Sequence, residues 1–390
     1  MNTELIKYNL DQLKTPCYFY DMELLERTLG EVRKIKDRYG YHVHYALKAN
    51  SNTRILRKIR EYGFGADCVS GNEILRALQT GYPPEEIAFA GVGKADWEID
   101  RGLEYDIGFF NCESISEIEV INERAAMKNT TANIALRINP EIDAKTHHYI
   151  TTGIEENKFG INRKDLPKVV ELLKKLNNIR LKGIHVHIGS QITDLDVFKS
   201  LCLRMNEIQD FFRKEHIELT DINVGGGLGL NYEDPEESTI PDFDSYFRVF
   251  REFLKIQPHQ KLHFELGRSL VGQCGALVTS VLYIKEGVNT NFAVVDAGMT
   301  ELIRPALYQA YHKITALTSN KPTRKYDVVG PICESSDYFG KSVELPELKR
   351  GDVLVIHSAG AYGEVMQFSY NLRDHLEFYY SADFVKAKKI

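Results

Sequence analysis

The stretch YHVHYALKAN, residues 41–50, opens the pattern that decides the fold of this 390-residue chain. Its first seven residues form a β-type run, and Lys48 follows directly. From there to about residue 265, short β-type runs alternate with longer helical patterns. The expected strands are Tyr41–Leu47, Phe64–Val69, Ile87–Ala90, Ile107–Phe110, Asn133–Ile138, Leu181–Ile188, Asp221–Val224 and Leu262–Glu265. Strands alternating with helices in this way predict an α/β fold, either a (β/α)8 barrel or an open doubly wound sheet.

Polar residues at the strand ends favour the barrel. At or just past the C-terminal ends of different expected strands lie Lys48, Asp67, His187, Gly225–Gly227 and Glu265. A barrel gathers these ends around one mouth, where barrel enzymes keep their catalytic residues, whereas an open sheet would spread them along a line. We therefore predict a (β/α)8 barrel over residues 25–270.

The sequence changes character after residue 270. Apolar runs separated by Gly, Pro, Asn and Asp indicate further strands over Gly275–Ile284, Asn291–Asp296, Tyr326–Val329, Asp352–His357 and Leu376–Phe384. The early run Thr15–Tyr20 precedes the barrel and is expected to join the same sheet. The sequence thus predicts a second, β-rich domain made of residues 1–24 and 271–390.

Composition narrows the class of protein. A net charge of -6 argues against nucleic acid or an anionic membrane as the main partner. The N-terminus lacks the pattern of a secretory signal, and no apolar stretch is long enough for a membrane helix. The cysteines are scattered without a Cys-x-x-Cys pair, which suits a reducing cytoplasm and disfavours structural zinc. We expect a cytoplasmic protein.

Lys48 is the first candidate for chemistry. It directly follows an apolar strand, where an ammonium group is costly unless it is paired. Desolvation lowers the pKa of a lysine, and the resulting amine is the nucleophile that Schiff-base chemistry requires. A snorkelling surface lysine explains this feature alone equally well.

The glycine run Gly225-Gly-Gly-Leu-Gly229 follows the expected strand Asp221–Val224. Backbone N–H groups in such a turn can converge on a phosphate because no Cβ blocks the approach. The run is neither a dinucleotide fingerprint nor a P-loop, because the third glycine is misplaced and Gly-Lys-Ser/Thr is missing. It predicts either a phosphate-binding turn or an ordinary tight turn.

His185 and His187 lie on the same face of an expected strand, because strand side chains alternate. Such a pair can bind a metal, but no third ligand with matching spacing is evident, so we expect no metal site. A single histidine stacked on a flat cofactor ring is equally compatible, and a satisfied core histidine is the usual alternative. Ser190 adds a hydroxyl near the same turn.

The segment Glu265-Leu-Gly-Arg268 places an acid and a base at the end of the last barrel strand. A carboxylate opposite a pyridine nitrogen keeps that nitrogen protonated and makes the ring an electron sink, and a Glu–Arg salt bridge is the alternative. Arg304, Tyr308, Cys333-Glu-Ser-Ser-Asp337 and Gly360-Ala-Tyr-Gly363 add charged and phenolic groups from the β-rich half. An arginine fork suits a substrate carboxylate, because it binds both oxygens in one plane.

Taken in order, these segments resemble the fold-type III pyridoxal-phosphate decarboxylases, most closely the branch that acts on diaminopimelate. The resemblance runs from Thr15 to about Arg373. It is carried by Tyr45-Ala-Leu-Lys-Ala-Asn50, His187-Ile-Gly-Ser-Gln-Ile192, Gly225-Gly-Gly-Leu-Gly229, Glu265-Leu-Gly-Arg268, Val295-Asp-Ala-Gly-Met299, Arg304-Pro-Ala-Leu-Tyr308 and Gly330-Pro-Ile-Cys-Glu-Ser335. Each motif alone is a weak or moderate signal, and their shared order in one chain is a strong one.

The resemblance implies pyridoxal 5'-phosphate as cofactor and assigns roles to matching positions. Lys48 would hold the cofactor as a Schiff base, His187 would stack on its ring, and Glu265 would pair with the pyridine nitrogen. The remaining cofactor-binding candidates are Asp67, Ser190, Gly226, Gly227, Gly267, Arg268 and Tyr362.

The resemblance also implies a small amino-acid substrate and a homodimer with shared active sites. The substrate would be bound by Arg268, Arg304, Tyr308, Glu334 and Tyr362. Cys333 would return a proton to the α-carbon, and the neighbouring subunit would supply both Cys333 and Glu334. The expected reaction is decarboxylation of meso-2,6-diaminopimelate to L-lysine and CO2, in lysine biosynthesis.

Two departures from the family pattern make the substrate less certain than the reaction type. The usual proline of the Glu-Pro-Gly-Arg turn is Leu266, and Met366-Gln-Phe368 replaces small polar residues. The first alternative is a related decarboxylase of ornithine, lysine, arginine or carboxynorspermidine, and alanine racemase shares the barrel but would not be expected to carry Cys-Glu-Ser-Ser. The second is a non-catalytic homologue that acts as a binding protein, although such a protein should have lost its lysine, phosphate loop or proton donor.

Overall fold

The computed structural model describes residues 1–142, 158–319 and 321–384. These residues divide into two compact units. One unit contains Leu29–Gly229 and Asp242–Gly267, and the other contains Met1–Thr28, Leu230–Pro241 and Arg268–Ile390. Each unit is described below by itself.

The first unit is a closed barrel of eight parallel strands, in which every strand pairs with its neighbour along the chain and β9 returns to β2. The strands are β2 (His42–Ala46), β3 (Gly65–Cys68), β4 (Ile87–Phe89), β5 (Phe109–Cys112), β6 (Ala132–Arg137), β7 (Ile179–His185), β8 (Asp221–Asn223) and β9 (Lys261–Leu266). The predicted (β/α)8 barrel is therefore confirmed, and the alternative of an open sheet is wrong.

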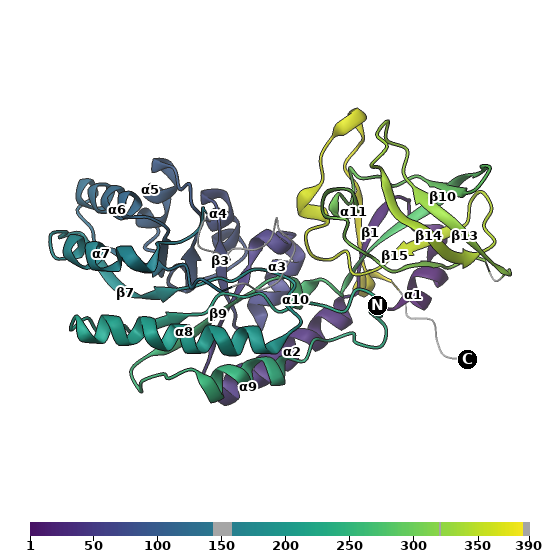
Figure 1. Cartoon of the computed structure of the whole chain (residues 1–390). Coiled ribbons are helices and arrows are strands. Elements are labelled where there is room, and N and C mark those ends of the chain that lie inside the picture. The colour runs from purple at the N-terminus through teal and green to yellow at the C-terminus, as the bar shows by residue number, and fades with distance from the viewer. Residues whose placement is uncertain (143–157, 320, 385–390) are drawn as a thin grey trace. The chain divides into compact units, whose positions relative to one another are not determined.

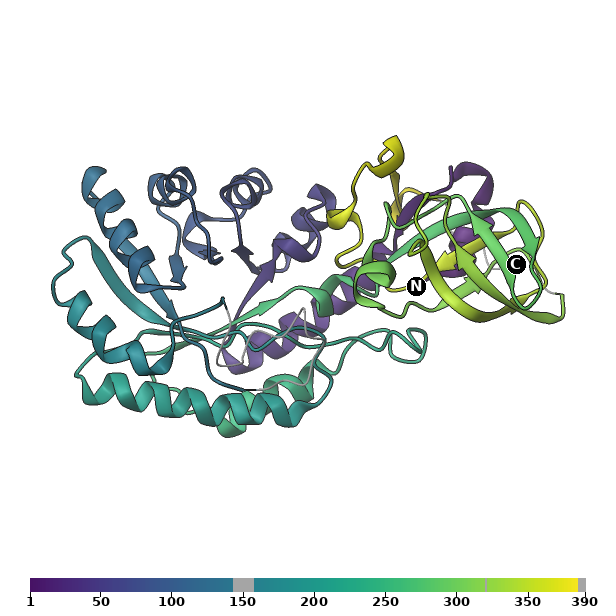
Figure 2. The ribbon, with the colours of Figure 1, turned by 45° about the horizontal axis from the view of Figure 1, so that its top comes forward.

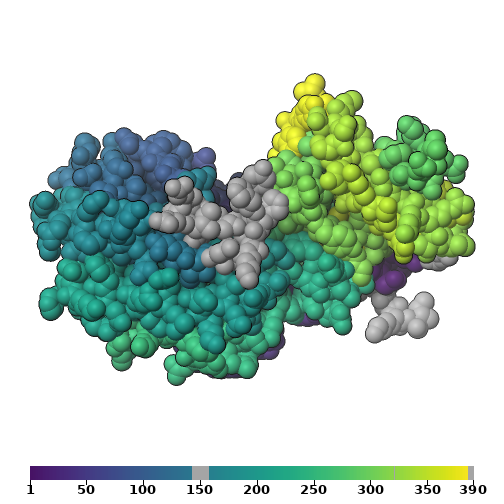
Figure 3. Space-filling view, in the orientation of Figure 1, coloured from purple at the N-terminus to yellow at the C-terminus, as the bar shows by residue number. Residues whose placement is uncertain are grey.

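Helices form the outer layer of this unit (Figures 1 and 2). They are α2 (Met22–Tyr39), which begins in the other unit, α3 (Thr53–Glu61), α4 (Gly71–Gln79), α5 (Asp96–Glu104), α6 (Ile115–Met127), α7 (Leu166–Leu173), α8 (Leu195–Lys214) and α9 (Phe243–Phe253). Figure 3 shows the surface of this unit in the orientation of Figure 1, coloured from blue to green along the chain.

The packing of α9 fixes the orientation of β9, the strand that carries Glu265. Phe243, Tyr246, Phe247 and Phe250 recur at a helical spacing and form the buried face of α9. The ring of Phe264 meets this face, with its centroid 4.7 Å from that of Phe247 and 4.9 Å from that of Phe250. Because strand side chains alternate, outward packing of Phe264 turns the side chain of Glu265 into the barrel.

The second unit is built around a sheet with the order β12-β15-β10-β11-β13-β14. Its strands are β10 (Gly275–Glu286), β11 (Asn291–Val295), β12 (Ile314–Ala316), β13 (Thr323–Val329), β14 (Tyr338–Pro346), β15 (Val353–Ile356), β16 (Glu377–Tyr380) and the N-terminal β1 (Cys17–Tyr20). Strand β1 pairs antiparallel with β10 and parallel with β16, so the predicted β-rich domain with an added N-terminal strand is confirmed. Its helices are α1 (Thr3–Tyr8), α10 (Arg268–Val271) and α11 (Arg304–Tyr308).

The segment Leu230–Pro241 belongs to the second unit, whereas the sequence placed it inside residues 25–270. Its polar contacts explain the difference. Gln273 Nε2 donates to the Asn231 carbonyl at 3.0 Å, and Lys313 forms an ion pair with Asp234 at 3.3 Å. The chain therefore leaves the barrel after Gly229 and re-enters it at Asp242.

Candidate active site

Lys48 lies where the backbone leaves β2 and turns through the short helix Leu47–Ala49. Its Nζ lies 3.6 Å from Oδ2 of Asp67 on β3, and its side chain is 38% exposed while that of Asp67 is 1% exposed. Neither Asp67 oxygen has a hydrogen-bond partner in the described part of the chain. Burial, reinforced by the charge of Glu265, raises the pKa of Asp67 to about 7, although Lys48 opposes this shift. A perturbed buried carboxyl beside a reachable amine is typical of a functional site.

Glu265 is held from three sides inside the barrel. Its Oε1 accepts hydrogen bonds from Asn111 Nδ2 at 3.1 Å and Asn223 Nδ2 at 2.7 Å, and its Oε2 lies 2.9 Å from His185 Nε2. Burial alone would raise the pKa of Glu265, but His185 and the charge of Lys48 outweigh burial and lower it. Glu265 is therefore a fixed, ionised carboxylate in a buried position.

His187 lies two residues beyond the end of β7. Its Nδ1 accepts the backbone N–H of Gly226 at 3.3 Å, so the ring carries its proton on Nε2 when it is neutral. Removal from water, together with the charge of Lys48, lowers its pKa well below the ordinary value. His187 is accordingly a neutral, oriented ring near pH 7.

The glycine turn after β8 lies too close to its neighbours for side chains. A Cβ on Gly226 would lie 2.0 Å from the carbonyl oxygen of Glu265, and Gly227 has φ +116°. The turn lies beside the segment that contains Ser190, because Ile192 N–H donates to the Gly227 carbonyl at 2.9 Å. The histidine segment and the glycine run therefore lie beside each other in the barrel unit.

Gly267 allows the end of β9 to approach the Lys48 turn. A Cβ at this position would lie 3.0 Å from Ala49 Cβ and 3.2 Å from Ala46 Cβ. The absence of a side chain at Gly267 thus lets the residues flanking Lys48 lie against the end of the strand that carries Glu265. Leu266, which replaces the usual proline, is buried and leaves this contact intact.

The residues at this end of the barrel fit the cofactor expected from the sequence. The ionised carboxylate of Glu265 can accept the N–H of a protonated pyridine. The turn around Gly226 and Gly227 keeps backbone N–H groups accessible to a phosphate. The buried oxygens of Asp67 and Nδ1 of His185 have no hydrogen-bond partner in the described ranges, which leaves polar groups for a ligand.

The second unit contains a separate polar cluster around Tyr232. The Tyr232 hydroxyl accepts hydrogen bonds from Nη1 of Arg268 at 2.7 Å and from Nη1 of Arg304 at 3.0 Å. Burial would raise the pKa of Tyr232, but the two arginines outweigh it and lower the pKa. Arg304 also donates to Nε2 of His312 at 2.9 Å, and it forms no ion pair with the described carboxylates. Arg304 is thus a buried cation with uncharged partners.

Two of the predicted substrate-binding tyrosines lie near this cluster. The guanidinium carbon of Arg268 lies 4.7 Å from the ring centroid of Tyr362, which has φ +56°. Tyr308 ends the helix that begins at Arg304. Burial would lower the pKa of Arg268, but Tyr232 and Tyr362, with a smaller contribution from Tyr308, raise it. The structure therefore brings together Arg268, Arg304 and Tyr362, with Tyr308 close by.

Cys333 and Glu334 do not join the cluster within one chain. Both are exposed. The N–H of Cys333 donates to Asn371 Oδ1 at 3.0 Å, and Glu334 accepts from the Tyr370 hydroxyl at 3.4 Å. No hydrogen bond or ion pair connects either residue with Arg268 or Arg304 in the part of the chain that the structure describes.

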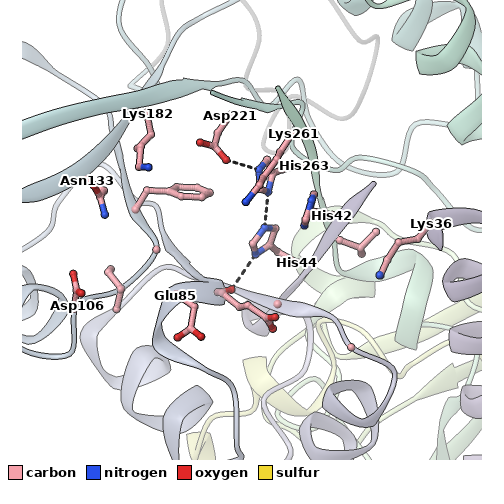
Figure 4. A pocket seen from close by; sticks show the side chains of 17 residues that line it. Lys36, His42, His44, Glu85, Asp106, Asn133, Lys182, Asp221, Lys261 and His263 are labelled. Carbon is pink, nitrogen blue, oxygen red and sulfur yellow. Dashed lines mark hydrogen bonds and ion pairs between the residues drawn. The ribbon is translucent and has the colours of Figure 1, made fainter. Parts of the chain in front are cut away.

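The opposite end of the barrel contains a hollow of about 430 Å³ at the N-terminal ends of the strands (Figure 4). A chain of hydrogen bonds runs from Asp221 Oδ1 to His263 Nε2 at 2.9 Å, from His263 Nδ1 to His44 Nε2 at 3.0 Å, and from His44 Nδ1 to the Glu86 carbonyl at 3.1 Å. The carbonyl only accepts, so His44 donates to it and accepts from His263. Both ring nitrogens of His44 and both ring nitrogens of His263 therefore have a partner in this chain of hydrogen bonds.

Sequence reasoning missed Asn111 and Asn223, which orient Glu265, and Tyr232 and His312, which contact the arginines. Asn111 is the third residue of the four-residue strand β5, and Asn223 is the last residue of β8. Burying a polar side chain inside a barrel costs free energy unless the side chain is hydrogen-bonded. An asparagine in a barrel strand therefore indicates a hydrogen-bonding role, and this signal could have identified both residues. No comparable signal marked Tyr232, whose contacts with the arginines are distant in sequence, or His312, which lies eight residues after Arg304.

Two further observations concern the described residues only. None of the helices among them is long and apolar enough to span a membrane. No group of three or more His, Cys, Asp or Glu side chains among them is arranged to hold a metal ion. The pair His185 and His187 therefore has no third partner of this kind in the described ranges.

Known proteins carry the same architecture. Residues 25–272 match the family model described as pyridoxal-dependent decarboxylase, pyridoxal binding domain. A diaminopimelate decarboxylase of Bacteroides thetaiotaomicron is 54% identical over 374 residues, which are 96% of this chain and 97% of that protein.

Two solved structures agree with this similarity. Diaminopimelate decarboxylase of Helicobacter pylori complexed with L-lysine has a TM-score of 0.90 and 40% identity, covering 96% of this chain and 93% of that one. The enzyme of M. jannaschii in complex with L-lysine has a TM-score of 0.88 and 34% identity, covering 96% and 88%. The chain therefore belongs to the pyridoxal-dependent decarboxylases and, within them, to the diaminopimelate decarboxylase family.

Proposed function

We propose that the chain is a pyridoxal-phosphate-dependent carboxy-lyase that converts meso-2,6-diaminopimelate to L-lysine and CO2, a step of lysine biosynthesis. The observation that carries this proposal is the buried carboxylate of Glu265, fixed by three donors at the same barrel end as Lys48. The family membership and the arginine pair of the second unit support it.

The residues of the barrel unit would hold the cofactor. Lys48 would attach it through its side-chain amine, and Glu265 would accept the pyridine N–H. His187 would cover one face of the ring as a neutral imidazole. When bound, pyridoxal phosphate accepts the electron pair that remains on the α-carbon after CO2 leaves. Phosphate would be bound by Ser190, Gly226, Gly227, the Gly267–Arg268 backbone and Tyr362, and Asp67 would remain beside Lys48.

The arginines of the second unit would bind the substrate. Arg304 is a buried cation whose described side-chain partners are neutral, so a substrate carboxylate would supply the missing negative charge. Arg268 would contribute the second guanidinium, and Tyr308 and Tyr362 would add phenolic groups. A substrate that retains a carboxylate after reaction matches this pair better than one that leaves a plain diamine.

Cys333 and Glu334 would act in the active site of a neighbouring subunit. Both are exposed and are not bonded to the arginines of their own chain, as a shared site requires. Cys333 would then donate the proton to the α-carbon, and Glu334 would bind the amine at the far end of the substrate. All six cysteines are free thiols, which suits a reducing cytoplasm.

A substrate panel tests the reaction. We expect CO2 release from meso-2,6-diaminopimelate, with L-lysine formed in equal amount, and little release from L-ornithine, L-arginine or L-lysine. Equal or faster turnover of ornithine would assign the chain to a related basic amino-acid decarboxylase. Absence of turnover with added cofactor on every substrate would identify a binding protein instead.

Mixing two inactive variants tests the shared site. Lys48→Ala and Cys333→Ala, each inactive alone, should recover about one quarter of wild-type activity after subunit exchange, because half of the dimers become mixed and each has one complete site. Recovery should not occur when Lys48→Ala is mixed with a Lys48→Ala/Cys333→Ala double variant. A monomer in sedimentation analysis, or no recovery despite exchange, would contradict the dimeric site.

A further inference from the structure

Tyr232 occupies an unusual position between two cations. Its hydroxyl accepts hydrogen bonds from Arg268 at 2.7 Å and from Arg304 at 3.0 Å, and the residue is 9% exposed. Two guanidinium groups repel each other when they are drawn together away from water. A phenolic oxygen has two lone pairs, so it can accept one N–H from each arginine and hold both at a defined separation.

The ring of Tyr232 adds a second contact to the same cations. The guanidinium carbon of Arg304 lies 4.9 Å from the ring centroid, and that of Arg268 lies 6.0 Å from it. Both distances are within the range of a cation–π interaction. The aromatic face and the hydroxyl of one residue therefore restrain both side chains.

His312 restrains Arg304 from another direction. Its Nδ1 lies 2.8 Å from the carbonyl of His357, which can only accept, so Nδ1 carries the ring proton. Nε2 is then left to accept from Arg304 Nη1 at 2.9 Å. Burial and the charge of Arg304 lower the pKa of His312 to about 3, so the ring stays neutral and remains an acceptor at neutral pH.

We propose that Tyr232 and His312 are positioning residues that fix the guanidinium groups of Arg268 and Arg304 for the carboxylate that the substrate keeps after decarboxylation. The proposal rests on the substrate role proposed above for the two arginines. The hydroxyl of Tyr232 accepts from Nη1 of each arginine, and His312 accepts from Nη1 of Arg304, so these contacts fix the orientation of both guanidinium groups. This arrangement favours an amino acid over the corresponding diamine.

A pair of ligands separates this role from a general structural one. L-Lysine and 1,5-diaminopentane have the same carbon chain apart from the carboxylate, so their ratio of dissociation constants measures what the carboxylate contributes. Both would be titrated calorimetrically into the cofactor-loaded protein and its variants. Steady-state decarboxylation of meso-2,6-diaminopimelate would be measured in parallel.

Tyr232→Phe removes one oxygen atom from the cluster. We expect it to weaken L-lysine binding about tenfold while 1,5-diaminopentane changes less than about twofold, since the hydrogen bonds that orient both arginines are lost. KM should rise by a similar factor with kcat nearly unchanged. Tyr246→Phe is the matched control, because Tyr246 is a buried tyrosine whose hydroxyl has no hydrogen-bond partner in the described chain, and it should bind both ligands normally.

His312 provides an independent test should the tyrosine variant fold poorly. His312→Leu removes the acceptor and should weaken L-lysine selectively, and His312→Gln should restore most of the affinity because its amide oxygen accepts the same N–H. Unchanged lysine binding in Tyr232→Phe and His312→Leu, or equal loss of both ligands, would overturn the positioning role. Arg304→Ala separates the two proposals, because normal lysine binding in that variant would refute the substrate role itself.

Discussion

Both ends of the barrel bury charged and polar side chains, but the two ends differ in how these side chains are hydrogen-bonded. At the N-terminal end, Asp221, His263 and His44 form a closed chain that ends on the Glu86 carbonyl (Figure 4). At the C-terminal end, Glu265 is fixed by its neighbours, whereas the oxygens of Asp67 and Nδ1 of His185 lack hydrogen-bond partners in the described chain. In the first network every ring nitrogen of His44 and His263 has a hydrogen-bond partner, whereas the second leaves atoms of Asp67 and His185 without one in the described chain.

The difference shows which end carries function. Buried polar groups in folded proteins are normally hydrogen-bonded, and an exception requires an explanation. A closed network stabilises the barrel, while unmet polar groups beside a reachable lysine indicate where a ligand supplies the missing partners. The family membership agrees with this assignment, because its cofactor requires an amine and an acid at one end.

Replacing Lys48 should produce the largest effect. Lys48→Ala removes the amine that attaches the cofactor, so we expect decarboxylation to fall by at least about a thousandfold. The visible absorption of lysine-bound cofactor should disappear as well. The matched control at the other barrel end is Lys182→Ala, which should retain both the absorption and the activity. Loss of both properties in Lys182→Ala would reverse the assignment of the ends.

Neutralising Glu265 should have the next largest effect. Glu265→Gln keeps the shape of the side chain but removes the charge that pairs with the pyridine nitrogen, so kcat should fall about a hundredfold. Glu85→Gln, at the N-terminal end, removes an exposed carboxylate and should leave kcat within about twofold of wild type. Equal rates for the Glu265 variant and wild type would exclude Glu265 from catalysis.

Breaking the closed network should change stability instead of activity. Asp221→Asn replaces the carboxylate that pairs with His263 Nε2 by a neutral amide, at a cost of about 2 kcal/mol in the free energy of unfolding. Urea unfolding would measure the loss, and kcat/KM of the folded protein should stay within about twofold. An inactive variant of normal stability would contradict the structural role of this end.

The pH dependence of stability should show a smaller effect from the same network. Burial and the charge of His263 lower the pKa of His44 to about 3, whereas the pKa of a histidine in the unfolded chain is about 6.5. Between these values the unfolded chain binds more protons, so stability falls as pH drops below about 6.5, by at most about 1.4 kcal/mol per pH unit. His44→Gln should flatten this slope in urea unfolding, whereas the exposed control His375→Gln should not.

Much of the fold followed from local sequence pattern. The eight barrel strands were expected within a few residues of their observed bounds, because each apolar run is short and interrupted by a helical pattern. Strands Ile314–Ala316 and Tyr338–Pro346 were not expected. The first is only three residues long, and the second contains Gly340, Lys341 and Ser342, which obscure its alternation.

Site residues could be predicted from the sequence where they lie at the C-terminal end of an expected strand. Lys48, Asp67, His187 and Glu265 share one barrel end, as expected from the convergence of parallel strands. The contacts of Tyr232 could not be predicted, because Arg268 and Arg304 lie 36 and 72 residues away in the chain. The boundary at Leu230 also depended on such contacts, since Gln273 binds Asn231.

Chemical trapping of the cofactor tests the central claim most directly. Borohydride reduction of the cofactor-loaded protein fixes pyridoxal phosphate to the lysine that holds it, and peptide mass spectrometry then locates the adduct. We predict that the adduct lies on Lys48 in the peptide that follows β2. An adduct on Lys36, Lys182 or Lys261, which line the opposite end of the barrel, would contradict the account.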